Sequence, residues 1–89
     1  MTWKVEYAES VQKDMRKIDT QDRKRIRDFI EVKVSGLDDP RTLGKPLAGS
    51  FSGLWRYRVG SYRIIASIED QDVRILIVKV AHRKEVYRH

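Results

Sequence analysis

The sequence has no cysteine, only two prolines and five glycines, and no long apolar run. Without cysteine there is no disulfide framework, no thiolate zinc site and no thiol nucleophile, so we expect an intracellular protein. No apolar segment approaches the ~20 residues of a membrane-spanning helix, and the first residues lack the apolar core of a signal peptide. These absences predict a cytoplasmic protein with no membrane association, stabilised by one hydrophobic core.

Motifs for metal and nucleotide chemistry are equally scarce. Histidine occurs only as His82 and His89, and neither belongs to an HxH or HExxH pattern. The P-loop, GxGxxG and GxSxG patterns are absent, and Asp38-Asp39-Pro40 is most simply a loop. We therefore expect neither a metal ion nor a cofactor.

Positive charge is what the sequence has in excess, with 19 lysines and arginines against 13 acidic residues and a net charge of +6. The basic residues are scattered among periodic apolar positions rather than gathered in a tail, which is typical of a folded domain. A chain of 89 residues forms a single domain, which we expect to span residues 1–89. The charge indicates a nucleic acid or an acidic protein as partner.

Hydrophobic periodicity predicts one strand, a helical hairpin and three further strands. Residues 2–7 alternate as a strand, and helical spacing follows, with a second helix beginning at a cap at Asp19 or Thr20. The segment 37–53 holds both prolines and reads as a loop with a short edge strand at 45–47. The order β-α-α-β-β-β predicts a two-layer α+β domain with the helices on the apolar face of an antiparallel β-meander.

Two further expectations concern strand placement. The helical hairpin should return the chain to the end where the first strand finished, so that strand should run antiparallel to the one containing Trp55. The segment 73–80 is almost continuously β-branched, which predicts a central strand buried on both faces.

The sequence around Gly60-Ser61 predicts a two-residue hairpin turn, of type II′ because glycine comes first. This register places Arg58 opposite Arg63, and the alternation of side chains puts Arg56 on the same face. Like charges opposite each other destabilise a sheet, so the arrangement indicates a site for a polyanion. The alternative is that the arginines simply extend into solvent.

A second turn at 69–72 would pair Ile68 with Val73 and place His82 on the arginine face, at the end of the last strand. The same pairing would place the apolar residues Ile65, Leu76 and Val78 on that face. Exposed apolar surface beside the arginines would suggest a binding partner. The run Arg23-Lys24-Arg25 is either a second nucleic-acid patch or a solvated helix face.

The arginine face predicts a metal-free basic site that includes Arg56, Arg58, Arg63 and Arg83, with Tyr57, Tyr62, Tyr87 and His82 nearby. Guanidinium groups donate two parallel hydrogen bonds to phosphate and stabilise the charge of a pentacoordinate phosphodiester transition state. Because an RNA 2′-hydroxyl can attack its own phosphate, such an enzyme needs in-line positioning, charge stabilisation and proton transfer rather than a metal. A tyrosine ring also offers a stacking surface for an unpaired base.

The segments 54–63 and 80–87 resemble the RelE/ParE superfamily of bacterial toxins from type II toxin–antitoxin pairs, and most closely its RelE branch. The resemblance covers essentially the whole chain and implies a RelE-like fold. It implies a toxin that cleaves messenger RNA in the ribosomal A site, inhibits translation and is neutralised by a RelB-like antitoxin with an acidic amphipathic segment. A toxin–antitoxin hetero-oligomer is expected.

Roles for individual residues follow from the resemblance, for Arg56, Arg58, Arg63, Arg83 and Tyr87, and otherwise from the chemistry of the residues themselves. The expected catalytic residues are Arg58, Arg63, Arg83, Tyr87 and His82. The expected RNA- and phosphate-binding residues are Arg56, Arg58, Tyr57 and Lys45. The family pattern has lysines on the first hairpin strand, one of them proposed as the general base, whereas arginine titrates above ~12 and is a poor base. His82 is the substitute that the sequence offers, although a histidine at a strand end can also be merely exposed.

Two other functions remain open at this point. One is a ParE-like toxin that binds and poisons DNA gyrase without cleaving RNA. The other is a basic, non-catalytic nucleic-acid-binding domain.

Overall fold

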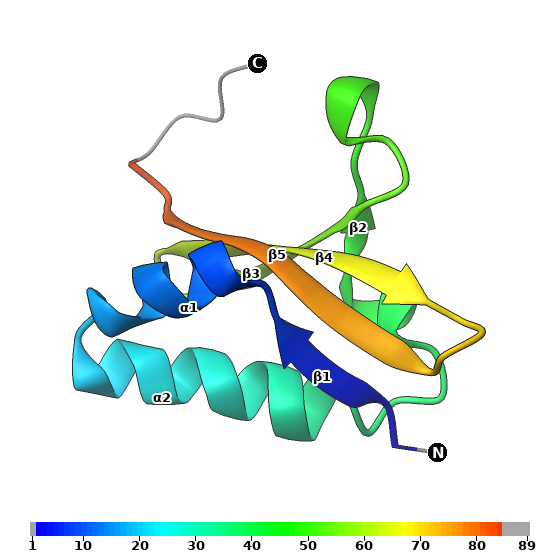
Figure 1. The fold of residues 1–89 in the computed structure, drawn as a ribbon, viewed down its shortest axis with the longest axis horizontal. Coiled ribbons are helices and arrows are strands. Elements are labelled where there is room, and N and C mark those ends of the chain that lie inside the picture. The colour runs from blue at the N-terminus through cyan, green and yellow to red at the C-terminus, as the bar shows by residue number, and fades with distance from the viewer. Residues whose placement is uncertain (1, 85–89) are drawn as a thin grey trace.

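The computed structural model describes residues 2–84. It contains a sheet that carries both helices on one face (Figure 1). The strands are β1 (Lys4–Tyr7), β2 (Lys45–Pro46), β3 (Trp55–Val59), β4 (Tyr62–Glu69) and β5 (Arg74–His82). The helices are α1 (Glu9–Arg16), α2 (Thr20–Asp28), the π-helical η1 (Phe29–Val34) that continues α2, and the 3-10 helices η2 (Pro40–Leu43) and η3 (Gly49–Phe51).

The strands form one mixed five-stranded sheet in the order β1-β5-β4-β3-β2. The meander β3-β4-β5 is antiparallel, and β2 is a short edge strand, so the predicted two-layer α+β architecture is confirmed. No helix within residues 2–84 is long and apolar enough to span a lipid bilayer.

The direction of β1 differs from the prediction. β1 pairs in parallel with β5, and because β5 and β3 are both antiparallel to β4, β1 runs parallel to β3. The expected antiparallel arrangement was wrong because the two arms of the helical hairpin differ in length. The arm formed by α2 and η1 carries the chain back to the beginning of β1, where the Trp3 amide donates to the Ser35 carbonyl at 2.9 Å.

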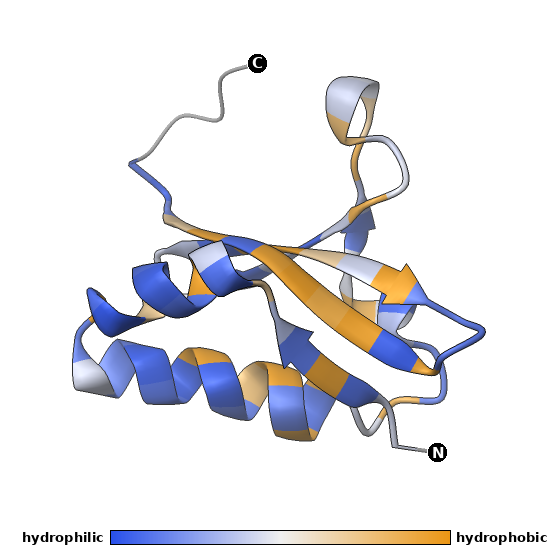
Figure 2. Cartoon of the chain, viewed as in Figure 1, coloured by the Kyte–Doolittle hydropathy of each residue, from blue (hydrophilic) through white to orange (hydrophobic). Residues whose placement is uncertain are grey.

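The helices begin and pack as their sequences predict. The Asp19 carboxylate caps α2 by accepting a hydrogen bond from the Gln21 amide at 3.1 Å. Hydrophilic residues follow the outer sides of both helices, whereas apolar residues face the sheet (Figure 2). The main core residues of the helices are Val11, Met15, Ile26, Ile30 and Val34, and those of the sheet are Tyr57, Val59, Ile64, Ala66, Ile75, Ile77 and Val80.

The β3–β4 hairpin has the predicted register. Gly60 has a φ of +56° in the turn, and Arg58 pairs with Arg63. The positive φ at the first central residue explains why glycine stands there.

The β4–β5 register was predicted wrongly. Glu69, rather than Ile68, pairs across the turn, and a β-bulge lies at Ile65/Ala66. Both differences shift β5 in the same direction, so that Ala81 lies opposite Arg63. The sequence did not show the bulge, because it depends on how β5 packs against β1 and α1 as well as β4.

The strand β5 is an interior strand, but it is not buried on both faces as predicted. Ile75 and Ile77 are fully buried against the helices, whereas Leu76 and Val78 are only half-buried. Ile65, the third apolar residue expected to be exposed on the arginine face, is buried with 2% of its surface accessible. The exposed apolar surface on this face is therefore smaller than predicted.

Candidate nucleic-acid interface

Three of the predicted catalytic arginines line one cavity of about 200 Å³ beside the β3–β4 turn. Arg58 comes from β3, Arg63 from β4, and Arg83 follows β5. The strand pairing holds Arg58 opposite Arg63, and the Arg83 amide donates to the Ser61 carbonyl at 2.6 Å. We call this space the arginine cavity; Gly60, Ser61 and Tyr62 complete its lining.

The arginine cavity concentrates positive charge in a small volume. The side chains of Arg58 and Arg83 are exposed, whereas Arg63 is half-buried. Each guanidinium can donate two parallel hydrogen bonds to the oxygens of one anion. The arrangement can therefore hold a phosphate group and stabilise additional negative charge on it.

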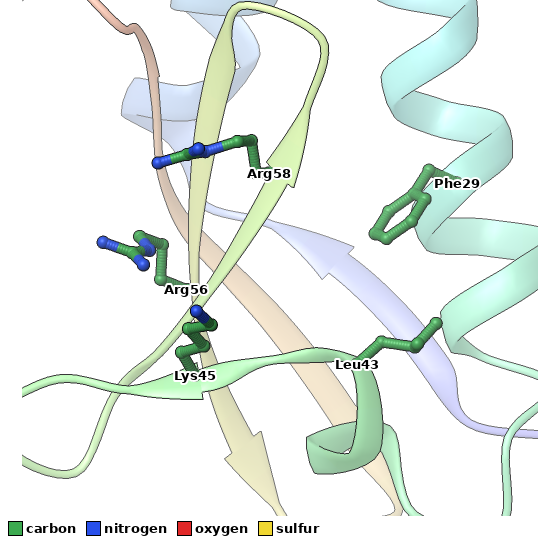
Figure 3. A pocket seen from close by; sticks show the side chains of 5 residues that line it. All are labelled: Phe29, Leu43, Lys45, Arg56 and Arg58. Atoms are coloured by element: carbon green, nitrogen blue, oxygen red, sulfur yellow. The ribbon is translucent and has the colours of Figure 1, made fainter.

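A second pocket of about 230 Å³ lies along the outer edge of β3, and Arg58 lines both spaces. Lys45 and Arg56 form its cationic side, where the two residues pair across β2 and β3. Phe29 and Leu43 form its apolar side, and they approach from η1 and η2 (Figure 3). We call this space the edge pocket. The structure thus brings Lys45 together with Arg56 and Arg58, and all three are expected to bind RNA or phosphate.

Tyr57 does not contact this surface, so its predicted role in RNA binding was wrong. The side chain is 2% exposed and packs in the core. Its hydroxyl donates to the Pro40 carbonyl at 2.6 Å. Burial raises the pKa of Tyr57 to about 12. The alternation along β3 had already placed this residue on the face opposite the arginines.

His82 also lies apart from the arginines, contrary to its predicted position. It pairs with Tyr62 across β4 and β5, and the two rings meet edge to face with centroids 5.2 Å apart. His82 lines a separate hollow of about 330 Å³, which includes Asp14 of α1 and Lys17, the C-cap of that helix. The register shift of β5 explains the difference, because it moves His82 to the face that carries the helices. Tyr87 lies outside the described residues.

The sequence did not single out Phe29 or Leu43 as residues of the site. Phe29 has the spacing of a core residue on its helix, and it is half-buried at the margin of the core. Only the path of the loop after η1 brings Leu43 beside it. The 41% exposure of Leu43 could not be read from its sequence neighbours.

The basic run at the start of α2 is partly neutralised. Lys24 forms an ion pair with Asp28 at 2.6 Å, and Arg25 lies 3.8 Å from Asp22. These contacts favour a solvated helix face for this pair of residues. Within residues 2–84, no group of three or more histidine, aspartate and glutamate side chains is placed to hold a metal ion.

The fold and the site together define a small basic α+β protein with an arginine-lined cavity beside the β3–β4 turn of its sheet. A family model described as the ParE toxin of the type II toxin–antitoxin system parDE matches residues 5–87. Toxin RelG of Mycobacterium tuberculosis is 27% identical over 99% of both chains. Toxin RelE3 of Methanocaldococcus jannaschii is 35% identical over 94% of both chains.

Solved structures agree with the sequence relatives. The RelBE2 toxin–antitoxin complex of Mycobacterium tuberculosis matches with a TM-score of 0.85 and 25% identity, covering 96% of this chain and 95% of that chain. The archaeal RelE–RelB complex of Pyrococcus horikoshii matches with a TM-score of 0.73 and 26% identity, covering 97% and 100%. The chain belongs to the RelE/ParE superfamily and to its RelE-like branch. It is a toxin of a toxin–antitoxin system.

Proposed function

We propose that this toxin inhibits translation as an endoribonuclease that cleaves messenger RNA in the ribosomal A site. The observation that carries the proposal is the arginine cavity, in which Arg58, Arg63 and Arg83 converge beside one turn. The relatives named RelG and RelE3 support the same function.

In this mechanism the arginine cavity binds the phosphate that is to be cleaved. The 2′-hydroxyl of the preceding nucleotide attacks the phosphorus, and the bond to the 5′-oxygen of the next nucleotide breaks. The phosphate gains negative charge in the pentacoordinate transition state, which the guanidinium groups of Arg58, Arg63 and Arg83 stabilise. Removing one such donor from an active site typically costs about 10²–10³-fold in rate.

Cleavage also requires that a proton leave the nucleophile and that one reach the leaving group. Arginine cannot accept a proton near neutral pH, and the Tyr57 hydroxyl is engaged with the Pro40 carbonyl. Tyr62 lines the arginine cavity, where its phenolic hydroxyl can donate a hydrogen bond. We therefore propose that the ribosome aligns the RNA and contributes to proton transfer, and that isolated RNA is cleaved very slowly. Tyr87 remains a proposed donor or orienting group.

We also propose a cognate antitoxin whose acidic segment covers the arginine face. The matching solved structures from Mycobacterium tuberculosis and Pyrococcus horikoshii are toxin–antitoxin complexes. An acidic segment suits the cationic row formed by Lys45, Arg56 and Arg58. A complex in which these three side chains stayed as exposed as in the free toxin would contradict this part of the proposal.

The test is primer-extension mapping of messenger RNA after a brief pulse of toxin expression, beside a gyrase supercoiling assay. We expect cuts that are phased with codons, normal gyrase activity and no cuts with the Arg63→Ala variant. Intact messenger RNA during growth arrest would overturn the proposal.

A second function is supported by the family model, which is described as a ParE toxin. In that case the toxin would bind and poison DNA gyrase without cleaving RNA. Inhibited supercoiling together with intact messenger RNA would establish this alternative.

A further inference from the structure

We propose that the edge pocket holds one unpaired nucleobase of the RNA next to the scissile phosphate, with Phe29 as its stacking partner. The inference rests on the proposed RNA cleavage, and it adds a base-binding subsite that includes residues of η1 and η2 as well as the sheet.

The two sides of the edge pocket match the two parts of a nucleotide. Phe29 and Leu43 provide an apolar side, and Lys45, Arg56 and Arg58 provide a cationic side. A nucleobase has flat faces that stack on aromatic rings, while the phosphates beside it bind cations. An acidic peptide would satisfy the cations, but it has no need of an aromatic ring held beside them.

The size of the edge pocket limits its occupant. Its volume of about 230 Å³ is below the ~300–1,000 Å³ of pockets that enclose drug-sized ligands. It therefore suits a single base, with the sugar and phosphate outside.

The position of the edge pocket connects it to the site of cleavage. Arg58 lines both the edge pocket and the arginine cavity. A phosphate held by Arg58 and Arg63 would thus have its neighbouring base within reach of Phe29. The same arginine would contact both parts of the substrate.

The Phe29 ring is held in place before any ligand binds. Its ring meets the Tyr57 ring at 65° with centroids 6.1 Å apart, and the hydroxyl of Tyr57 is fixed by the Pro40 carbonyl. The Phe29 side chain is only half-buried, and Lys33 Nζ lies 5.7 Å from the centroid of its ring. Buried Tyr57 thereby acts as the support of a stacking platform.

The experiment measures single-turnover cleavage on ribosomes that carry messenger RNA with one abasic nucleotide, placed in turn at each position around the cut. The wild type is compared with Phe29→Leu, which keeps an apolar side chain but removes the ring. Val32→Ala is the matched control, because Val32 lies on the same helical segment, is 71% exposed and does not line the edge pocket. A second pocket variant, Leu43→Ser, gives the same test at an exposed position if Phe29→Leu fails to fold.

We expect the wild type to lose about tenfold in rate, a magnitude typical of base stacking, when one position next to the cut is abasic. Phe29→Leu should lose a similar factor on intact RNA and lose nothing further on that abasic RNA. Val32→Ala should behave as the wild type.

The base subsite would be overturned if the rate losses from Phe29→Leu and from the abasic nucleotide multiplied at every position. It would also be overturned if Phe29→Leu cleaved normally and only bound the antitoxin more weakly. These results leave the proposed cleavage standing. A wild type that cuts no RNA on ribosomes would instead overturn the proposed function, and the subsite with it.

Discussion

Arg58 and Arg63 lie directly opposite each other across β3 and β4, one residue from the Gly60-Ser61 turn on each strand. A pair of like charges in this position disfavours the sheet by an amount on the scale of cross-strand pairs, about 0.2–1 kcal/mol. Arg83 adds a third guanidinium to the same cavity. This arrangement disfavours folding and favours the binding of an anion. Removing one of these arginines should therefore reduce toxicity without lowering the free energy of unfolding.

We therefore expect Arg63→Ala to abolish growth inhibition and to leave the free energy of unfolding unchanged or slightly higher. The measurements are a growth assay on induced expression and urea denaturation. The matched control is Arg16→Ala, which removes the same charge from an exposed position on α1 and should leave the toxin active. Full toxicity of Arg63→Ala would show that the arginine cavity is not the active surface.

The Tyr57 hydroxyl should contribute to stability in a way that depends on pH. Because burial raises its pKa from 10.0 to about 12, the folded state retains this proton more strongly than the unfolded state. The stabilisation is complete below pH 10 and is lost as the pH rises through 10 to 12.

We expect Tyr57→Phe to lower the free energy of unfolding by about 1–2 kcal/mol below pH 9, since the Pro40 carbonyl loses its donor. The difference between wild type and variant should narrow between pH 10 and 12. Denaturation curves across that range measure it, and both proteins keep Tyr7, whose pKa is also raised. A constant difference over the whole range would contradict the raised pKa.

Gly60 should be intolerant of a side chain for two reasons. Its φ is +56°, and an added Cβ would lie 3.3 Å from the Arg25 guanidinium. Gly49 has a similar φ of +66° but open space around it, so it isolates the cost of the backbone strain.

We expect Gly49→Ala and Gly60→Ala each to destabilise the fold by roughly 1–2 kcal/mol, the cost of a side chain in the left-handed region. Gly60→Ala should cost more, and it alone should reduce toxicity, because its turn positions Arg58 and Arg63. Denaturation measures the stability of both variants, and growth assays measure their toxicity. If both substitutions changed toxicity equally, the turn at Gly60 would have no special role in positioning Arg58 and Arg63.

Local patterns predicted most of what is found near the β3–β4 turn. A two-residue loop leaves little choice of register, so the pairing of Arg58 with Arg63 followed from Gly60-Ser61 alone. The cap at Asp19 followed equally from a local interaction.

Features that depend on distant contacts were not predictable in this way. The bulge at Ile65/Ala66 and the shift of the β4–β5 turn from residues 69–72 to residues 70–73 moved His82 by three residues relative to the arginines. The edge pocket depends on the loop that brings Leu43 beside Phe29. Neither the β4–β5 register nor the edge pocket can be predicted from the local sequence, because each depends on how separate elements pack.

The last prediction follows from that shift of His82. The sequence made His82 the substitute for a general base. The structure places it beside Tyr62 and near Asp14 and Lys17, outside the arginine cavity. A general acid or base contributes about 10²–10⁴-fold to a rate, and it must reach the proton that it transfers. We therefore expect His82→Ala to change the single-turnover rate on ribosomes by less than about threefold, well below that range.

The control for this measurement is Arg63→Ala, which should reduce the same rate by about 10²-fold or more. The pH profile of cleavage should also keep its shape in His82→Ala, since the residue transfers no proton in the reaction. A loss of 10²-fold in His82→Ala, with a changed pH profile, would make the histidine catalytic. The end of β5 would then have to rearrange on the ribosome so that His82 reaches the side of the sheet on which Arg58 and Arg63 lie.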